Sequence, residues 1–277
     1  MDSFIFTASL LVPLVAVLSS LPLPINGSNR TRTVFRANVS RVALAVTSLP
    51  LCAFFICVCI ALLRDFDGAT STHCDVPNLL PSISASIGDY TPQRYIWRTA
   101  ISLHSGPRLL YAYMHNTWLK GHSQESTIDG HTYESFCKIA FICNLIEIFS
   151  LMLLTSVSST EYFAFHEACT VLFLLMSFAY MSLVVLLFHW LPQRHRDYQS
   201  SKIKVICWLV TSISILLMLY LYWRHNKYCE PYVYTVFAFF EYIVVLTNMC
   251  FHGTAALDLK DKEIIVSSEN SRTWQDV

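Results

Sequence analysis

The sequence predicts an all-α integral membrane protein built as a six-helix transmembrane bundle, with room for an additional N-terminal hydrophobic segment. Of its 277 residues, 54% are hydrophobic and only 14% are charged, whereas soluble domains carry about 25% charged residues. The apolar residues also gather into long runs separated by short polar connections. A formal net charge of zero argues against a nucleic-acid partner.

Six apolar runs are each long enough to cross a hydrocarbon layer about 30 Å thick. They comprise residues 42–63, 95–118, 136–157, 166–190, 205–223 and 233–254. The second run is the least apolar, because it carries Arg98, His104 and Arg108. Charged groups are costly in lipid, so we expect this run to pack inside the bundle.

The positions of Lys and Arg indicate the orientation, because both are enriched in cytosolic connections. The connection at 158–165 contains neither residue, whereas the connection at 191–204 contains four. Three parts are therefore expected along the chain. They are an N-terminal apolar segment with a basic cytosolic stretch (1–41), a six-span membrane domain with a lumenal loop at 64–94 (42–254), and a mobile cytosolic tail (255–277).

The apolar start of the chain allows three interpretations. Residues 4–22 are apolar, but Pro13 interrupts them and no positive charge precedes them. An extra spanning helix, a cleaved signal and an interfacial segment all fit this pattern.

Four polar residues are expected in one layer within the membrane. Counted from the outer helix ends at 1.5 Å per residue, His104, Glu147 and Glu241 lie roughly 12–15 Å deep. Arg108 shares the helix face of His104, because the two are four residues apart. We expect Arg108 to pair with one or both carboxylates. The layer is either an interhelical clamp or a polar cavity in which a histidine acts as acid or base.

A second group is expected at the outer rim, where it suits proton transfer or head-group recognition as well as an ordinary hydrated interface. Its members are Arg98, Glu161, His166, Glu167, Arg224, His225, Tyr228 and Glu230. The histidines and the asparagine near the cytosolic ends are expected to be solvated or to cap helices. These are His115, His189, Asn248 and His252.

Two of the ten cysteines, Cys74 and Cys229, lie in connections on the outer side. That compartment is oxidising, so a disulfide between them is expected, with free thiols as the alternative. Most other cysteines lie inside apolar runs, and we interpret them as small buried side chains. No pair has C-x-x-C spacing, and the sequence predicts no metal site.

Several long segments resemble the Frag/DRAM/Sfk family of membrane proteins, and within it the post-GPI-attachment-to-proteins factors. The segments read HCDVPNLLPSISASIGDYTPQRYIWR, LHSGPR, SSTEYFAFHE, RHNKYCEPYVYTVFAFFEY and VVLTNMCFH, and the similarity covers about 34–270. The resemblance implies a multi-pass protein of the Golgi and endoplasmic reticulum membranes. It also implies a role in remodelling the lipid of glycosylphosphatidylinositol (GPI) anchors, with lyso-GPI-anchored proteins and membrane lipid as partners and other remodelling membrane proteins as associates.

The leading functional hypothesis is an acyltransferase that restores a saturated, stearoyl chain at the sn-2 position of lyso-GPI. The reaction needs a base and a group that stabilises the oxyanion. We expect His104, oriented by Glu147 or Glu241, to be the base and Arg108 to be the stabilising group. His166 and His225 are the second choice, with Arg224 holding the anchor phosphate. No cofactor is expected, and acyl-CoA or another lipid is the donor.

Two other functions remain open from the sequence. The chain contains no G-x-S-x-G, Walker or H-E-x-x-H motif, and no histidine is followed five positions later by Asp. A non-enzymatic factor that binds lyso-GPI proteins and escorts them to a separate acyltransferase therefore stays as an alternative. A transporter is less favoured, because no inverted repeat is visible.

Overall fold

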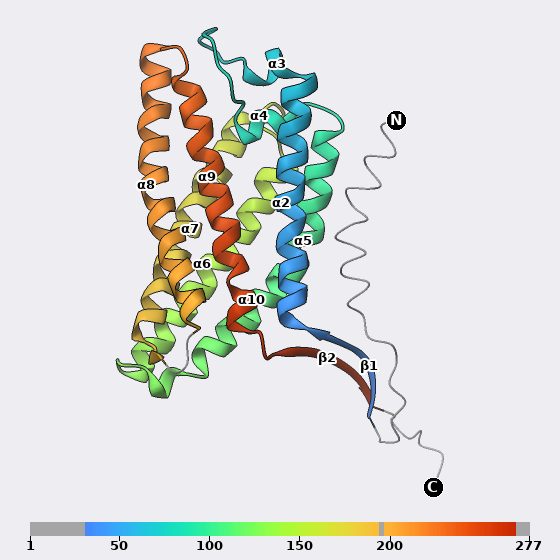
Figure 1. Ribbon diagram of the computed structural model, residues 1–277, viewed down its shortest axis with the longest axis vertical. Coiled ribbons are helices and arrows are strands. Elements are labelled where there is room, and N and C mark those ends of the chain that lie inside the picture. The colour runs from blue at the N-terminus through green and yellow to red at the C-terminus, as the bar shows by residue number, and fades with distance from the viewer. Residues whose placement is uncertain (1–30, 194–196, 270–277) are drawn as a thin grey trace.

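The computed structural model describes residues 31–193 and 197–269. Six long helices run side by side along the molecule, and successive helices run in opposite directions (Figure 1). They are α2 (Val39–Arg64), α5 (Gln93–Lys120), α6 (Gly130–Ser156), α7 (Phe163–Trp190), α8 (Tyr198–Tyr228) and α9 (Val233–Gly253). The expected apolar segment 1–25 lies outside the described residues, as do the basic residues Arg30, Arg194, Arg196 and Arg272.

Short helices occupy the two ends of the bundle. The loop end, at the top of Figure 1, carries α3 (Phe66–Thr70) and α4 (Ile83–Gly88). The opposite end, here called the arm end, carries η1 (Ser123–Glu125) and α10 (Ala255–Asp258).

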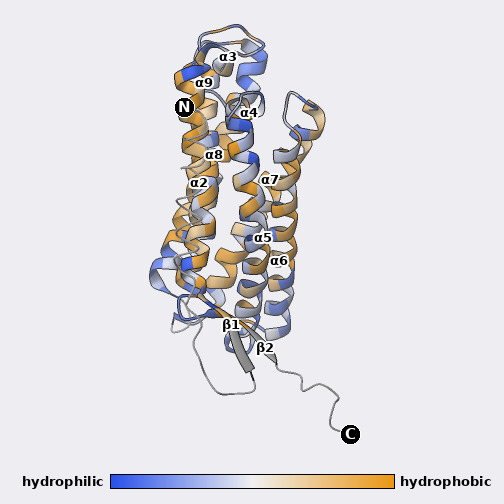
Figure 2. Cartoon of the chain, turned by 90° about the vertical axis from the view of Figure 1, so that its right-hand side faces the viewer, coloured by the Kyte–Doolittle hydropathy of each residue, from blue (hydrophilic) through white to orange (hydrophobic). Residues whose placement is uncertain are grey.

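Within the described residues, five helices are long and apolar enough to cross a membrane, and the chain is a multi-pass membrane protein. They are α2, α6, α7, α8 and α9, the last continuing through α10 to Asp258. Figure 2 shows hydrophobic residues along these helices and hydrophilic ones concentrated toward the two ends. The remaining long helix, α5, does not meet the apolar criterion, so composition supports five of the six predicted spans.

Helix α5 is amphipathic because its buried residues recur every three or four positions. Ile101, His104, Arg108 and Ala112 are buried on this face, while Leu103, Leu110 and Tyr113 are exposed. The face packs against α2 and α6. His104 and Arg108 are therefore held inside the bundle, as the sequence predicted, whereas the Arg98 side chain is 31% exposed.

A two-stranded antiparallel sheet corrects the all-α prediction. Strand β1 (Thr31–Asn38) pairs with β2 (Glu263–Glu269), forming the arm below the bundle in Figure 1. The Ile-Ile-Val run at 264–266 favours a strand, and Arg36 bonds Glu263 at 2.8 Å across the ladder. The segment up to Glu269 is therefore part of the fold, and not the mobile tail that its polarity suggested.

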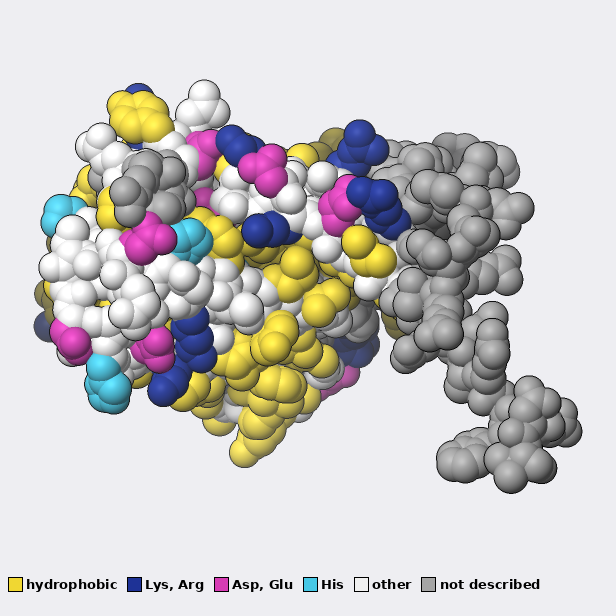
Figure 3. Space-filling model, turned by 90° about the horizontal axis from the view of Figure 1, so that it is seen from below, with side chains coloured by type: hydrophobic (Ala, Val, Ile, Leu, Met, Phe, Trp, Pro, Cys, Tyr) yellow, Lys and Arg dark blue, Asp and Glu magenta, His cyan; other side chains and the backbone are white. Residues whose placement is uncertain are grey.

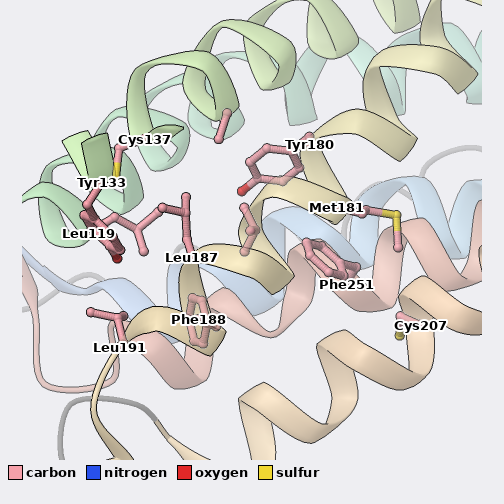
Figure 4. Packing of buried hydrophobic residues seen from close by; sticks show 12 residues of the cluster. Leu119, Tyr133, Cys137, Tyr180, Met181, Leu187, Phe188, Leu191, Cys207 and Phe251 are labelled. Carbon is pink, nitrogen blue, oxygen red and sulfur yellow. The ribbon is translucent and has the colours of Figure 1, made fainter. Parts of the chain in front are cut away.

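The hydrophobic core consists of two clusters of buried side chains that hold the helices together. One lies toward the arm end and joins α5, α6, α7, α8 and α9 around Tyr133, Met181 and Leu187 (Figure 4). The other lies toward the loop end, where Phe54 and Cys57 of α2 pack with Ile83 of α4 and Trp97 of α5. These two packed regions hold the polar side chains between them in place.

The loop between α2 and α5 is docked onto the bundle. Cys74 and Cys229 form a disulfide that ties this loop to the α8–α9 connection. Tyr242 of α9 donates a hydrogen bond to the Pro81 carbonyl at 2.7 Å, next to α4. The loop therefore forms an ordered cover over the helices at the loop end.

Candidate functional site

An elongated, mostly apolar cavity runs through the loop-end half of the bundle. Its volume is about 140 Å³, and part of it opens to the surroundings. Along α9 it is lined from Phe237 to His252, about 22 Å at the rise of a helix. Ser84 of α4 lines it toward the loop end, and His104 and Arg108 of α5 also line it. An apolar cavity with a few polar groups facing it has the composition typical of a ligand site.

A buried ion pair forms the polar centre of the bundle. Arg108 Nη2 lies 2.6 Å from Glu147 Oε1, and the side chain of Glu147 is fully buried. Asn248 Nδ2 donates to the same oxygen at 2.9 Å and to Ser177 Oγ at 2.6 Å. His252 Nε2 lies 3.0 Å from Glu147 and 2.7 Å from Arg108. We call the set of Arg108, Glu147, Asn248 and His252 the inner cluster; it joins α5, α6 and α9.

His104 lies one helical turn from Arg108 and is 5% exposed. Its Nδ1 lies 2.9 Å from the Val46 carbonyl of α2, an acceptor that requires Nδ1 to carry the hydrogen. Nε2 then holds a free lone pair, and no hydrogen-bond partner for it occurs among the described residues. A neutral imidazole held in this tautomer is arranged to accept a proton from a ligand in the cavity.

A second cavity meets the first at this point. It is lined by Val39, Val46, Leu110 and Met114 and by the more polar Tyr111 and Asn144. Both cavities are lined by Thr47, His104, Arg108 and His252. The second also reaches Ile264 of β2, toward the arm end. His104 and Arg108 therefore stand at the junction of two spaces that extend toward opposite ends of the molecule.

Two sequence expectations for this layer are wrong. Glu241 lies apart from the inner cluster, where its Oε2 accepts the Ile83 amide hydrogen of α4 at 3.0 Å. His104 is oriented by a backbone carbonyl and not by either glutamate. Figure 1 shows the reason: the α8–α9 hairpin extends further toward the loop end than α6 and α7, so depths counted from helix ends do not share one origin.

Asn248 and His252 were expected at solvated or capping positions, and their place in the inner cluster corrects that expectation. A signal for them exists in the sequence. Glu241, Asn248 and His252 are spaced by seven and four residues, which puts all three on one face of a helix. A polar stripe on an otherwise apolar helix indicates a face turned toward the bundle interior.

The loop end holds a second histidine arrangement. His166 Nε2 lies 2.9 Å from Ser84 Oγ, and His166 Nδ1 lies 2.8 Å from the Val157 carbonyl. His166 is 6% exposed. Ser84 lines the first cavity, and His166 orients its hydroxyl from behind.

The charged residues predicted for substrate binding are paired with one another. Arg98 contacts Glu161 at 2.8 Å, and Arg224 contacts both carboxylate oxygens of Glu230, at 2.6 and 3.0 Å. The Ser158 amide and then Arg98 hold the pKa of Glu161 below its ordinary value. Hydrogen bonds from Arg224 lower the pKa of Glu230 in the same way. Glu167, six positions after Glu161, is exposed.

His225 is fully buried and lies away from both cavities. Its ring contacts Tyr234 and His73, with centroids 5.0 and 5.4 Å apart. Neither ring nitrogen has a hydrogen-bond partner within residues 31–193 and 197–269. The structure therefore places His225 beneath the disulfide-linked loop, separate from His166.

A further buried charge cluster lies at the arm end and was not predicted. Lys204 contacts Asp258 at 2.6 Å, and its ammonium also donates to Ser200 and Thr254 at 2.6 and 2.7 Å. His115 lies 3.3 Å from Asp258, which corrects its expected solvated role. The cluster fixes α10 to α8 and α5. Lys204 had been assigned to a cytosolic connection because of its charge.

Comparison with known proteins identifies the family. The model of the Frag1/DRAM/Sfk1/Cwh43P N-terminal domain matches residues 38–262. Post-GPI attachment to proteins factor 2 of Caenorhabditis elegans is 43% identical over 229 residues, covering 81% of this chain and 87% of the relative. Acyltransferase PGAP2 of Xenopus tropicalis is 39% identical over 257 residues, covering 90% and 99%.

A more distant relative and the solved structures complete the comparison. Protein cwh43 of Schizosaccharomyces pombe is 26% identical over 238 residues, which cover 84% of this chain but 22% of that protein. No solved structure matches the chain. The matched region of the family model includes every long helix of the bundle. The chain belongs to the Frag1/DRAM/Sfk1/Cwh43P N-terminal domain family.

Proposed function

We propose that the chain takes part in the lipid remodelling of GPI anchors, as an acyltransferase that adds a saturated, stearoyl chain to lyso-GPI at sn-2. The names of the relatives, post-GPI attachment factor and acyltransferase, support this assignment. We place it in the Golgi and endoplasmic reticulum membranes, with the loop end lumenal. Helix α5 is then the sixth span, inserted because its charged face is enclosed by the other helices.

The observation that carries the proposal is the position of His104 beside a buried arginine in an apolar cavity. Acyl transfer to a hydroxyl requires a base for the hydroxyl proton and a positive group for the developing oxyanion. His104 Nε2 supplies the base, and Arg108, fixed in place by Glu147, supplies the charge. The apolar walls exclude water and so limit hydrolysis of the donor.

The reaction follows from these roles. The sn-2 hydroxyl gives its proton to His104 Nε2 as its oxygen attacks the acyl carbonyl. The tetrahedral oxyanion is stabilised by Arg108, and its collapse breaks the bond to the donor's leaving group. The imidazolium then returns the proton to that leaving group. The product is the diacyl anchor, and His104 is neutral again.

The loop end is assigned to recognition of the anchor head group. Arg98 and Arg224 are partly exposed there, and each already has a carboxylate partner. Binding an anchor phosphate would require exchange of that carboxylate for the phosphate. Ser84 lines the first cavity, where its hydroxyl, oriented by His166, can bond the glycerol of the lipid.

The alternative is a non-enzymatic factor that binds lyso-GPI proteins for a separate acyltransferase. The inner cluster favours this function in one respect, since Glu147 connects α6 to α5 and α9 as a clamp would. In that case the cavity holds the lipid without reacting with it.

Reconstitution of the purified full chain in liposomes separates the two functions. The liposomes contain lyso-GPI and labelled stearoyl-CoA, with a labelled stearoyl phospholipid in a parallel sample, and mass spectrometry follows the diacyl product. An acyltransferase forms product with one of these donors. Retention of lyso-GPI without product from either donor would contradict the enzymatic proposal and support the escort.

A further inference from the structure

The second cavity contains polar atoms that the protein itself leaves unpaired. The Tyr111 hydroxyl, Asn144 Oδ1 and Arg108 Nε are buried and have no hydrogen-bond partner in the part of the chain that the structure describes. All three residues line this cavity. A buried polar group without a hydrogen-bond partner destabilises the protein. Two donors and an acceptor are therefore unpaired beside one cavity, where a polar ligand that enters it could pair with them.

The donors are arranged for a carbonyl group at the junction. Arg108 and Tyr111 are three residues apart on α5, so they lie on neighbouring positions of one helix face. Arg108 uses Nη2 for Glu147 and His252, which leaves Nε–H available. A carbonyl oxygen that accepts from Nε–H and the Tyr111 hydroxyl would lie beside His104, because all three residues line the second cavity.

Positive charge flanks this cavity toward the arm end. The cavity is lined by Val39, Val42 and Ile264, and exposed Arg41 lies between the two valines on α2. Lys262 is next to them, because the Val39 amide donates to the Lys262 carbonyl at 3.0 Å. Figure 3 views this end and shows Lys and Arg side chains, with Asp and Glu among them, around an exposed hydrophobic area. Such a border suits a phosphorylated head group.

We propose that the second cavity is the acyl-donor site. The donor is an acyl thioester of a phosphate-bearing carrier, such as acyl-CoA, and it enters from the arm end. The inference rests on the proposed acyltransferase function and names its second substrate. The fatty chain points into the first cavity, and the thioester carbonyl lies at Arg108 and Tyr111. The second cavity, about 50 Å³ in volume, takes the thioester sulfur and widens toward the arm end to admit the thiol arm. The carrier's phosphates contact Arg41 and Lys262.

The transfer step is balanced with this donor. The acceptor hydroxyl attacks the thioester carbon, and its proton passes to His104 Nε2. The carbon–sulfur bond breaks, and the thiolate takes the proton from His104 to leave as a free thiol. No oxidant or reductant is required.

Tyr111→Phe tests the carbonyl contact in the reconstituted full chain with stearoyl-CoA. Loss of one oxyanion donor is expected to lower kcat by about tenfold or more. Tyr113→Phe is the matched control, because Tyr113 is on the same helix but 60% exposed. Its rate is expected to equal that of the unchanged protein. Equal rates for Tyr111→Phe and Tyr113→Phe would overturn the carbonyl assignment.

Arg41→Glu with Lys262→Glu tests the entrance. The pair of changes is expected to raise KM for stearoyl-CoA about fivefold or more while KM for lyso-GPI stays constant, with a larger effect at low salt. An unchanged KM for stearoyl-CoA would overturn the assignment of the entrance to the arm end. Product formed from phospholipid but not from stearoyl-CoA would overturn the thioester donor and leave the acyltransferase function standing. Absence of product with either donor would overturn both proposals.

Discussion

The inner cluster and the loop-end pairs both combine arginine with glutamate, yet their surroundings differ. The Arg108 and Glu147 side chains are 7% and 0% exposed, whereas those of Arg98 and Glu161 are 31% and 43% exposed. The two arginines lie on the same helix, about three turns apart. A pair screened by water contributes little to stability, but breaking a buried pair leaves an uncompensated charge. Breaking the buried Arg–Glu pair is therefore expected to cost more stability than breaking the exposed pair.

The same contrast applies to the two histidines. His104 keeps Nε2 free at the junction of both cavities, whereas His166 Nε2 is already bonded to Ser84. We therefore assign the reaction to the inner end and recognition to the loop end. The predictions below test this division.

The largest effect is expected for Arg108→Met. It leaves Glu147 charged and buried without its main partner, which costs about 3–5 kcal/mol of folding stability. Adding Glu147→Met should recover most of that loss without restoring product formation. Arg98→Met is the matched control and should leave the thermal midpoint of the detergent-solubilised protein nearly unchanged. Equal thermal midpoints for Arg108→Met and Arg98→Met would show that burial does not change how much an Arg–Glu pair contributes to stability.

A smaller effect is expected for Glu241→Ala. This change removes the acceptor for the Ile83 amide and loosens the contact between α9 and α4. The expected cost is about 1–3 kcal/mol, the range for an orphaned buried donor. Glu241→Gln keeps an acceptor oxygen and should be closer to the unchanged protein. Thermal unfolding followed by proteolysis within 64–92 measures both, and a Gln variant as weak as Ala would point to a role for the charge.

The smallest effect is expected for mild acidification of the loop end. The pKa values of Glu161 and Glu230 are lowered in the folded protein. Their contribution is thus present above the ordinary glutamate pKa of about 4.3 and is lost as pH falls through the lowered value. Protease sensitivity of the loop should not change between about pH 7 and 5.5, where histidine titrates. A rise in cleavage in this range that Glu161→Gln abolishes would contradict this.

Much of the fold could be predicted from the sequence, because the runs of apolar residues mark the helices directly. The burial of one face of α5 also followed from its polar residues, since His104 and Arg108 are four positions apart and share that face. The expected pairing of Arg108 with Glu147 is confirmed by their 2.6 Å contact. The Cys74–Cys229 disulfide occurs in the structure as the positions of these cysteines suggested.

The errors arose where neighbours are set by packing between helices. Helix α9 is apolar around most of its surface, so its sequence alone did not show which polar residue would meet Glu147, and Asn248 and His252 were misplaced. The ladder between β1 and β2 pairs segments more than 220 positions apart. Lys204 was counted only as a charge of the 191–204 connection, and its pairing with Asp258 on another element was not predicted. Local composition contains no information on such pairings.

The most direct measurement of the central claim compares His104→Ala with His166→Ala in liposomes that hold lyso-GPI and labelled stearoyl-CoA. Thermal midpoints first establish that both variants are folded. His104→Ala is expected to lower the rate of diacyl product formation about 10²–10⁴-fold, the contribution of a general base, while His166→Ala keeps most of the rate and weakens lyso-GPI binding. The reverse result, with His166→Ala inactive and His104→Ala active, would move the reaction to the loop end and contradict the assignment.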